Sequence, residues 1–326
     1  MTVKQLDLLN IGLMLLACVV AFVIPFELFL LAYAVLGPLH YLTEIGWLHN
    51  RNYFATGKYD FVWLILLCLI LCSFFFIFTD VPQENKALCL FLAFASGLAM
   101  ILFDNFVYKV LAICIGFFVG VALQDIPVFF VLFAVLLPTI IHVFVFTGLF
   151  IFSGALKNKS ITGYLSLLVF ILCAVSFFVL HPHFAFYQVS DYAKDNLVAT
   201  NFHFVNQYLM YLGGEKNPTL DKVMGSEMGF SIMRLIAFAY TYHYLNWFSK
   251  TSVIKWYAVP KKWLISIVLI WVFSVALYAY DYVTGLKALL FLSMLHVFLE
   301  FPLNFRSFQI INTSIKGMIL GDKTAS

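Results

Sequence analysis

Charged residues are scarce in this chain: Asp, Glu, Lys and Arg make up 11% of its 326 residues, and 63% are hydrophobic. The mean hydropathy is correspondingly high, at +0.99. A water-soluble globule needs far more polar surface than this composition supplies. Spanning helices of about 20 residues each would also use most of the length. The composition therefore predicts a polytopic membrane protein and excludes a separate soluble domain such as a Rossmann or P-loop module.

Two further features are missing, and each excludes a class of site. The formal net charge is only +3, and Lys and Arg are spread along the chain, so no basic stripe could follow a nucleic-acid backbone. The six cysteines lie in apolar runs with no CxxC pair. Such cysteines are typical of small core residues, so we expect neither a disulfide framework nor an iron–sulfur or structural zinc site.

Apolar runs between breakers predict an all-α bundle of about ten transmembrane helices. The first hairpin, turned only at Pro25, and the tight hairpin near Asp104 leave nine spans as an alternative. We expect one transmembrane domain over 1–326, with an outer-face loop at about 182–226 and a short cytoplasmic tail at about 303–326. The expected spans are 7–24, 26–48, 60–79, 87–103, 107–123, 127–152, 161–181, 227–249, 263–280 and 286–302.

The positive charges predict the orientation. If the N-terminus is inside, most of the nineteen Lys and Arg residues fall on the cytoplasmic side, as the positive-inside rule requires. We therefore expect an integral protein of a bacterial inner membrane with both termini in the cytoplasm. We read the 182–226 loop as an interfacial connector, with a lid over an entrance as the alternative.

Ionisable side chains inside the predicted spans are few, and their cost in hydrocarbon makes them markers of a site. The informative residues are His40, Glu44, His142, His243, His296 and Glu300. In the predicted topology their four helices run in the same direction. At about 1.5 Å per residue, the four imidazoles then lie at one depth to within roughly one helical turn. The sequence therefore predicts a layer of histidines in the cytoplasmic half of the membrane.

This layer has the chemistry of a metal site. Neutral imidazole is the commonest metal ligand, and a set of histidines and carboxylates suits iron, zinc or manganese. Glu44 and Glu300 each follow a histidine by one helical turn, and we expect these candidate catalytic carboxylates to complete the ligand set or to orient the rings. We expect iron, with one ion favoured over two and with zinc or manganese as alternatives. The expected metal ligands are His40, His142, His243 and His296.

Two other readings of the layer stay open. The same His and Glu residues could carry protons or a metal ion across the membrane, or the histidines could simply join helices by hydrogen bonds. A carrier needs a continuous polar route, but the outer halves of these helices are almost wholly apolar apart from Arg234 and Glu227. This pattern favours a buried reaction site over a transport path.

The stretch Gly37-Pro38-Leu39-His40, together with Pro138 and His142, resembles the membrane-embedded β-carotene dioxygenases associated with bacterial rhodopsins. The resemblance implies a histidine-ligated non-haem iron and oxidation or cleavage of a lipid-like substrate, such as a carotenoid or another isoprenoid. Tyr41 and Glu44 stand where that family has Gly and Asp. The expected partners are membrane lipids and an apolar small molecule.

Overall fold

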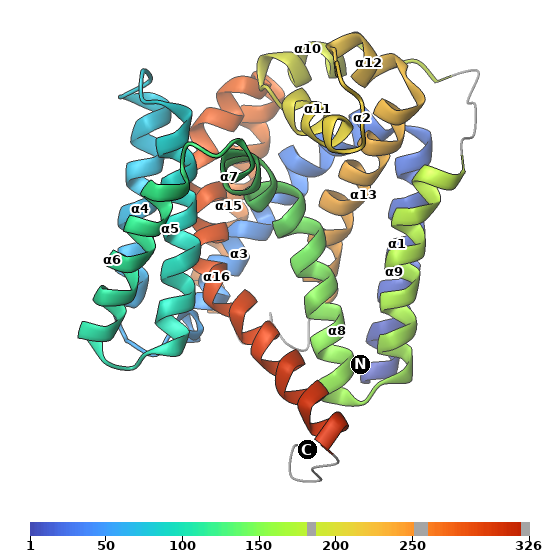
Figure 1. Cartoon of the computed structure of the whole chain (residues 1–326). Coiled ribbons are helices and arrows are strands. Elements are labelled where there is room, and N and C mark those ends of the chain that lie inside the picture. Colours follow the sequence, from blue (N-terminus) through green and yellow to red (C-terminus); the bar gives the residue numbers. More distant parts are fainter. Residues whose placement is uncertain (181–186, 251–259, 321–326) are drawn as a thin grey trace. The chain divides into compact units, whose positions relative to one another are not determined.

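The computed structural model describes residues 1–180, 187–250 and 260–320 (Figure 1). Every regular element in these ranges is a helix, which confirms the all-α fold. Eight of the described helices are long and apolar enough to cross a membrane. The beginning of the expected outer-face loop, 182–186, and the end of the expected tail, 321–326, lie outside the described residues.

The chain divides into two compact units, and α3 (Gly37–His49) passes from the first to the second between His40 and Tyr41. The first unit comprises Met1–His40 and Asn158–Leu289. Its helices are α1 (Val3–Val23), α2 (Pro25–Leu31), the π-helical η1 (Ala32–Leu36), α9 (Ile161–Val179), α10 (Asp191–Ala199), α11 (His203–Leu212), α12 (Leu220–Gly225), α13 (Glu227–Ser249) and α15 (Lys261–Tyr280).

The second unit comprises Tyr41–Lys157 and the chain from Leu290 onward. It holds most of α3 and most of the long helix α16 (Tyr282–Leu320), which starts in the first unit. Its other elements are the short turn η2 (Asn52–Phe54), α4 (Asp60–Phe76), α5 (Gln83–Leu102), α6 (Phe106–Leu123), α7 (Pro127–Phe130), the π-helical η3 (Val131–Phe146) and α8 (Thr147–Asn158).

A helix occupies most of each range predicted to span. Eight meet the length and apolarity expected of a span, α4 is shorter at 17 residues, and α13 is the remaining one. The count of ten therefore stays a prediction. The last predicted span, 286–302, is shorter than the observed helix, because α16 continues through Pro302 as far as Leu320. Neighbouring helices can support a proline inside a membrane helix, so this residue does not end it.

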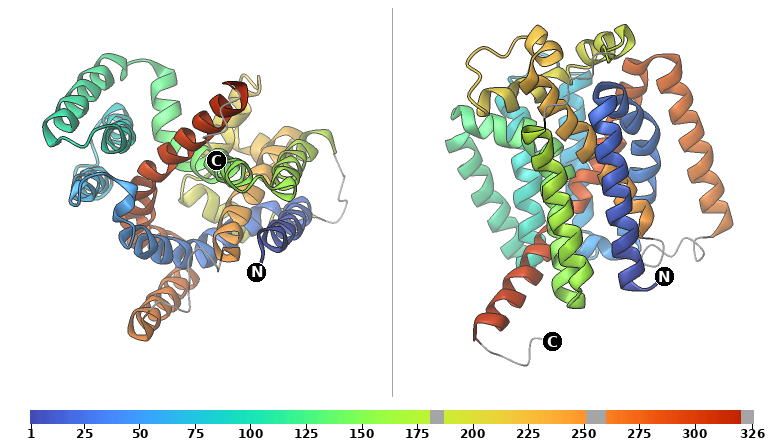
Figure 2. Two further views of the ribbon diagram at one scale, coloured as in Figure 1. Left: turned by 90° about the horizontal axis from the view of Figure 1, so that it is seen from below. Right: turned by 90° about the vertical axis from the view of Figure 1, so that its right-hand side faces the viewer.

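In the first unit, α13 packs against α1, α2 and α9, and α1 and α9 run beside each other (Figure 2). Hydrogen bonds tie α1 to α13: Tyr242 and Ser249 donate from their hydroxyls to Asn10 Oδ1 at 3.3 and 3.1 Å. Between membrane helices such polar contacts and close packing replace the hydrophobic effect as the stabilising terms.

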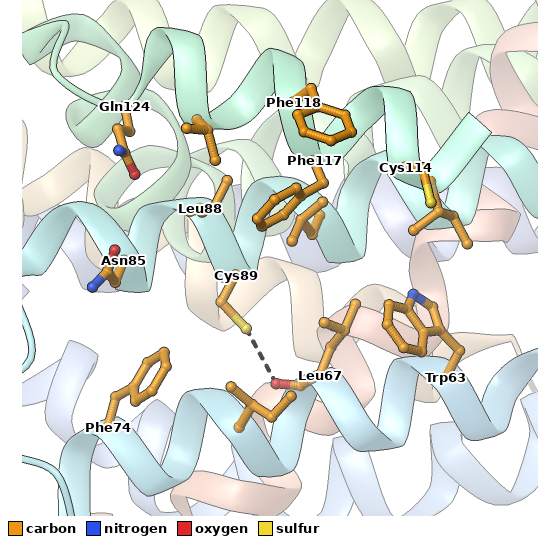
Figure 3. A pocket seen from close by; sticks show the side chains of 14 residues that line it. Trp63, Leu67, Phe74, Asn85, Leu88, Cys89, Cys114, Phe117, Phe118 and Gln124 are labelled. Carbon is orange, nitrogen blue, oxygen red and sulfur yellow. Dashed lines mark hydrogen bonds between the residues drawn. The ribbon is translucent and has the colours of Figure 1, made fainter. Parts of the chain in front are cut away.

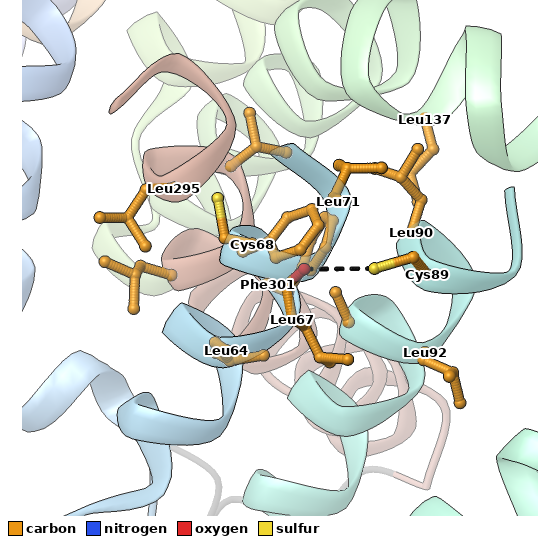
Figure 4. Close-up of a cluster of buried hydrophobic side chains, with 14 of the residues drawn as sticks. Leu64, Leu67, Cys68, Leu71, Cys89, Leu90, Leu92, Leu137, Leu295 and Phe301 are labelled. Atoms are coloured by element: carbon orange, nitrogen blue, oxygen red, sulfur yellow. Dashed lines mark hydrogen bonds between the residues drawn. The ribbon is translucent and has the colours of Figure 1, made fainter. Parts of the chain in front are cut away.

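In the second unit, α16 packs against α4 and α5 through a cluster of buried side chains that includes Leu71, Leu90 and Phe301 (Figure 4). Gly97 permits the close approach, because a Cβ there would lie 2.7 Å from the Cβ of Phe301. The Cys89 thiol donates to the Leu67 carbonyl at 3.2 Å. The cluster fixes one face of α16, and His296, Glu300 and Asn304 share another face at four-residue spacing.

Candidate functional site

The six residues predicted to form the site are all buried, each no more than 6% exposed. His40 and Glu44 lie on α3, His142 on η3, His243 on α13, and His296 and Glu300 on α16. An imidazole or carboxylate at this level of burial needs a specific partner, because burial without one is costly. The structure places the histidines in two close pairs.

The first pair is His40 and His243, both in the first unit. Their Nε2 atoms lie 3.1 Å apart, and their rings meet edge to face with centroids 4.6 Å apart. Tyr244 and Trp247 wall the His40 ring, at centroid distances of 5.1 and 5.6 Å. These aromatic side chains leave His40 only 1% exposed.

The backbone before His40 departs from the α-helix. In η1 the N–H of Gly37 donates to the Ala32 carbonyl, five residues back, and Pro38 has no N–H to offer. The indole N–H of Trp271 donates to the Val35 carbonyl at 2.8 Å. Short π-helical segments are frequent at functional sites, and this one sets the direction in which α3 presents His40.

Gly37 brings α13 close to the same turn. A Cβ at this position would lie 3.3 Å from the hydroxyl oxygen of Tyr244, tighter than an ordinary contact. The Gly-Pro pair ahead of His40 therefore has a local structural reason. The glycine admits the Tyr244 ring, and the proline leaves a carbonyl of the preceding turn without its usual donor.

The second pair is His142 and His296, both in the second unit. Their Nε2 atoms lie 3.2 Å apart, with ring centroids 5.1 Å apart. Glu300 Oε2 lies 3.1 Å from Nδ1 of His142, so this ring has a histidine at one nitrogen and a carboxylate at the other. The Tyr41 ring lies against His296 at 5.7 Å.

His142 also stands on a π-helical backbone. The segment η3 runs for 16 residues, with Pro138 inside it and Thr139 in a non-helical conformation at φ −117° and ψ −106°. The Thr139 hydroxyl donates to the Val135 carbonyl, which compensates locally for the interrupted ladder. The proline and the backbone distortion both lie within about one turn of His142.

The spacing of the ring nitrogens fits a metal ion. Two nitrogens bound to one ion at about 2.1 Å lie roughly 3.0 to 3.4 Å apart when the angle at the ion is about 90 to 110°. The two observed Nε2 separations, 3.1 and 3.2 Å, fall in this range. Each unit therefore holds a buried pair of ring nitrogens at a spacing that binding to one metal ion would give. Imidazole ligands alone suit several metals.

Three further observations concern residues outside the two histidine pairs. Asp104 is exposed and does not cap the next helix, since Asn105 accepts from the N–H of Val107 at 2.8 Å and is the N-cap of α6. Tyr242 bonds to Asn10. The aromatic walls Tyr41, Tyr244 and Trp247 were missed, although Trp247 follows His243 by one helical turn, a spacing that could have revealed it.

A separate groove of about 700 Å³ lies in the second unit along α4, α5 and α6 (Figure 3). Trp63, Leu67 and Phe117 contribute to its apolar lining, and the amides of Asn85 and Gln124 lie toward one end. Its lining includes no histidine and no carboxylate. This groove therefore offers shape and apolar surface, but none of the histidine chemistry of the buried pairs.

Comparisons with protein-family models, curated proteins and solved structures find no match to this chain.

Proposed function

We propose that the protein is an intramembrane non-haem iron oxygenase or oxidase acting on a lipid-like substrate. The observation that carries the proposal is the spacing of the ring nitrogens in the two buried histidine pairs: the Nε2 atoms lie 3.1 Å apart in His40 and His243, and 3.2 Å apart in His142 and His296. In this proposal the four histidines are the nitrogen ligands. A redox-active iron with histidine ligands would supply activation of dioxygen beside an apolar substrate.

The residues of the chain would hold and shape this site. Glu300 lies against Nδ1 of His142 and would fix the orientation and tautomer of that ring, leaving Nε2 for the metal. Three aromatic rings would exclude water from the histidines. Tyr244 and Trp247 lie against His40, and Tyr41 lies against His296. Glu44, buried one turn after His40, would complete the ligand set or orient a ring.

The choice of substrate rests on two supports. The site lies among helices apolar enough to cross a membrane, so an apolar molecule would reach it from the bilayer. The resemblance of Gly37 to His40, and of Pro138 and His142, to the carotene dioxygenases favours a carotenoid or another isoprenoid. The proposal places the protein in a bacterial inner membrane with both termini in the cytoplasm, which accessibility labelling at each end of the chain would test.

A second candidate, proton or metal transport, draws on the same geometry. Nε2 atoms 3.1 and 3.2 Å apart are also at hydrogen-bonding distance, so each pair could pass a proton from one ring to the other. In either case the histidines would be needed for flux across liposome membranes, and for proton transport the purified protein would hold no stoichiometric metal.

Elemental analysis decides between the oxygenase and proton transport, and flux of the metal itself across liposome membranes would indicate metal transport. The protein, purified in detergent without a histidine tag, should contain iron at one or two equivalents per chain and show the matching optical spectrum. Single substitutions to Ala at His40, His142, His243 and His296 should each reduce the metal content sharply. His203→Ala is the matched control, because His203 is also buried but bonds to the Leu197 carbonyl. Absence of stoichiometric metal after anaerobic reconstitution with ferrous iron would contradict the oxygenase proposal.

A further inference from the structure

Arg234 is a buried cation in the N-terminal half of α13. Its side chain is 6% exposed. Its Nε has no hydrogen-bond partner, and within the described part of the chain the guanidinium forms no ion pair. The guanidinium lies over two aromatic rings instead, 5.3 Å from the centroid of Phe22 and 5.8 Å from that of Phe230.

One carboxylate near this region, that of Glu27 on α2, already accepts three hydrogen bonds. Glu27 accepts hydrogen bonds from the Tyr187 hydroxyl at 2.7 Å and from the Ser190 N–H and hydroxyl at 3.0 and 2.8 Å. Tyr187 packs on Phe230, the same ring that Arg234 covers. Glu27 therefore ties the segment before α10 to α2 and does not neutralise the arginine.

Aromatic faces alone do not satisfy such a group. An arginine remains charged in proteins and carries five N–H donors in a planar fork. A ring face attracts the charge but accepts few of those hydrogen bonds. The fork matches the paired oxygens of a carboxylate or phosphate, which is why buried guanidinium groups so often mark the binding of oxyanions.

A second polar group stands on the same part of α13. Ser231 is 2% exposed, and its Oγ has no partner within the described residues. A helical serine commonly bonds to a carbonyl of the preceding turn, and this one does not. Ser231 precedes Arg234 by three residues, so the hydroxyl and the guanidinium lie on neighbouring faces of one turn.

This site is distinct from the histidines. Arg234 and His243 are nine residues apart on α13, which at about 100° per residue places them on opposite faces of the helix. Arg234 lies against Phe22 of α1, and His243 lies against His40 of α3. A ligand of Arg234 is therefore no part of the proposed metal site.

We propose that Arg234, with Ser231 beside it, binds an oxyanion: the phosphate or carboxylate group of an amphiphilic molecule whose hydrocarbon chain lies between the membrane helices. The Phe22 and Phe230 rings give the charged group apolar walls, which suits an anion attached to such a chain.

Binding to delipidated protein in a neutral detergent tests this proposal. The probes are palmitate, phosphatidylglycerol and inorganic phosphate, with affinity measured by titration and retention by native mass spectrometry. We expect the wild type to bind at least one probe, and Arg234→Met to bind it at least ten-fold more weakly. Binding of a lipid probe alone identifies the source as a lipid headgroup or fatty acid. Equal binding of inorganic phosphate would identify the ligand as a free anion and would contradict the hydrocarbon chain in the proposal.

Three controls keep the test decisive. Arg51→Met makes the same change at an arginine stacked on Trp47 in the second unit, and should leave binding unchanged. Arg234→Lys keeps the positive charge but loses the planar set of N–H donors, so it should bind with intermediate affinity. It also replaces Arg234→Met as the test variant if Arg234→Met does not fold. Ser231→Ala should weaken binding less than Arg234→Met.

Thermal unfolding separates binding from a purely structural role. An added oxyanion should raise the unfolding temperature of the wild type and not that of Arg234→Met, and iron content should be the same in both. Failure of the wild type to bind any of the three probes, or equal binding by wild type and Arg234→Met, would overturn the proposal. The proposal would also be overturned if Arg234→Met were less stable than the wild type by the same amount with and without the oxyanion.

Discussion

The carboxylate of Glu300 lies against His142, a residue of a different helix, with Oε2 3.1 Å from Nδ1. Sequence spacing alone associates Glu300 with His296, its neighbour one turn away on α16. The structure gives it a partner on η3 instead. On α16, His296 thus faces Nε2 of His142, and Glu300 faces Nδ1 of the same ring.

Glu300→Gln should weaken metal binding by roughly 10- to 100-fold, the usual loss when the partner of a ligating histidine is removed. The amide keeps the size of the side chain but removes the negative charge that lies beside Nδ1 of His142. Titration with a competing chelator measures the affinity. Glu84→Gln, at an exposed position in the first turn of α5, should have no effect. Equal affinities in the two variants would show that Glu300 does not support the ligand.

Gly97→Ala should destabilise the second unit, because the new Cβ would lie 2.7 Å from the Cβ of Phe301 on α16. Overpacking of this kind costs about 1 to 3 kcal/mol. Gly154→Ala is the matched control, since a Cβ there has no neighbour within 4 Å. The unfolding temperature in detergent should fall for Gly97→Ala and stay level or rise for Gly154→Ala. A fall of equal size in both would refute the close packing of α5 and α16.

Lys109→Met should be strongly destabilising, because it leaves Asp60 without its cation. Lys109 Nζ donates to Asp60 Oδ2 at 2.6 Å, and both side chains are largely buried, at 6% and 12% exposure. Removing one member of a buried pair typically costs about 3 to 5 kcal/mol.

The double variant Asp60→Asn with Lys109→Met should recover much of that loss, since it removes both charges. A double-mutant cycle based on thermal unfolding measures the coupling of the two residues. Additive effects of the two single substitutions would mean that the charges do not interact.

We expect the free energy of unfolding to fall at alkaline pH because of the Tyr187 phenol. Burial, and then its hydrogen bond to the Glu27 carboxylate, raise the pKa of the phenol above its ordinary value of 10.0. The unfolded chain therefore loses this proton at a lower pH than the folded protein does. The stabilisation is fully present below about pH 10 and declines as the pH rises toward the folded pKa.

In Tyr187→Phe this decline should be smaller when unfolding temperatures are compared between about pH 9 and pH 11. Tyr211→Phe, at a tyrosine that is 62% exposed, should keep the slope of the wild type. A Tyr187→Phe variant with an unchanged slope would show that the phenol does not contribute.

The fold and the choice of residues could be predicted because they depend on composition and on local chemistry. Long apolar runs indicate membrane helices, and the rarity of His40, His142, His243 and His296 within such runs made them prominent. The pairing of the histidines could not be predicted, since it depends on which helix faces lie together.

The backbone conformation around the site could not be predicted from the sequence either. Pro138 and the Gly37-Pro38 pair suggested irregular helices, but a pattern with 3.6 residues per turn does not show where a π ladder starts or how far it runs. The partner of Glu300 could not be predicted for a related reason. Spacing along one helix ranks His296 first, and only tertiary packing brings in His142.

The length of η3 has a consequence for altering this protein. Each residue added to or removed from an α-helix turns everything beyond it by about 100°, and in a π-helix the turn is smaller because each turn holds more residues. A deletion between Val131 and His142 would swing the imidazole away from both His296 and Glu300 even if every side chain of the site were kept. The number of residues in this stretch is thus as much a part of the site as the histidine itself, and homologues or redesigned variants should be aligned here by π-helical register before residue identities are compared.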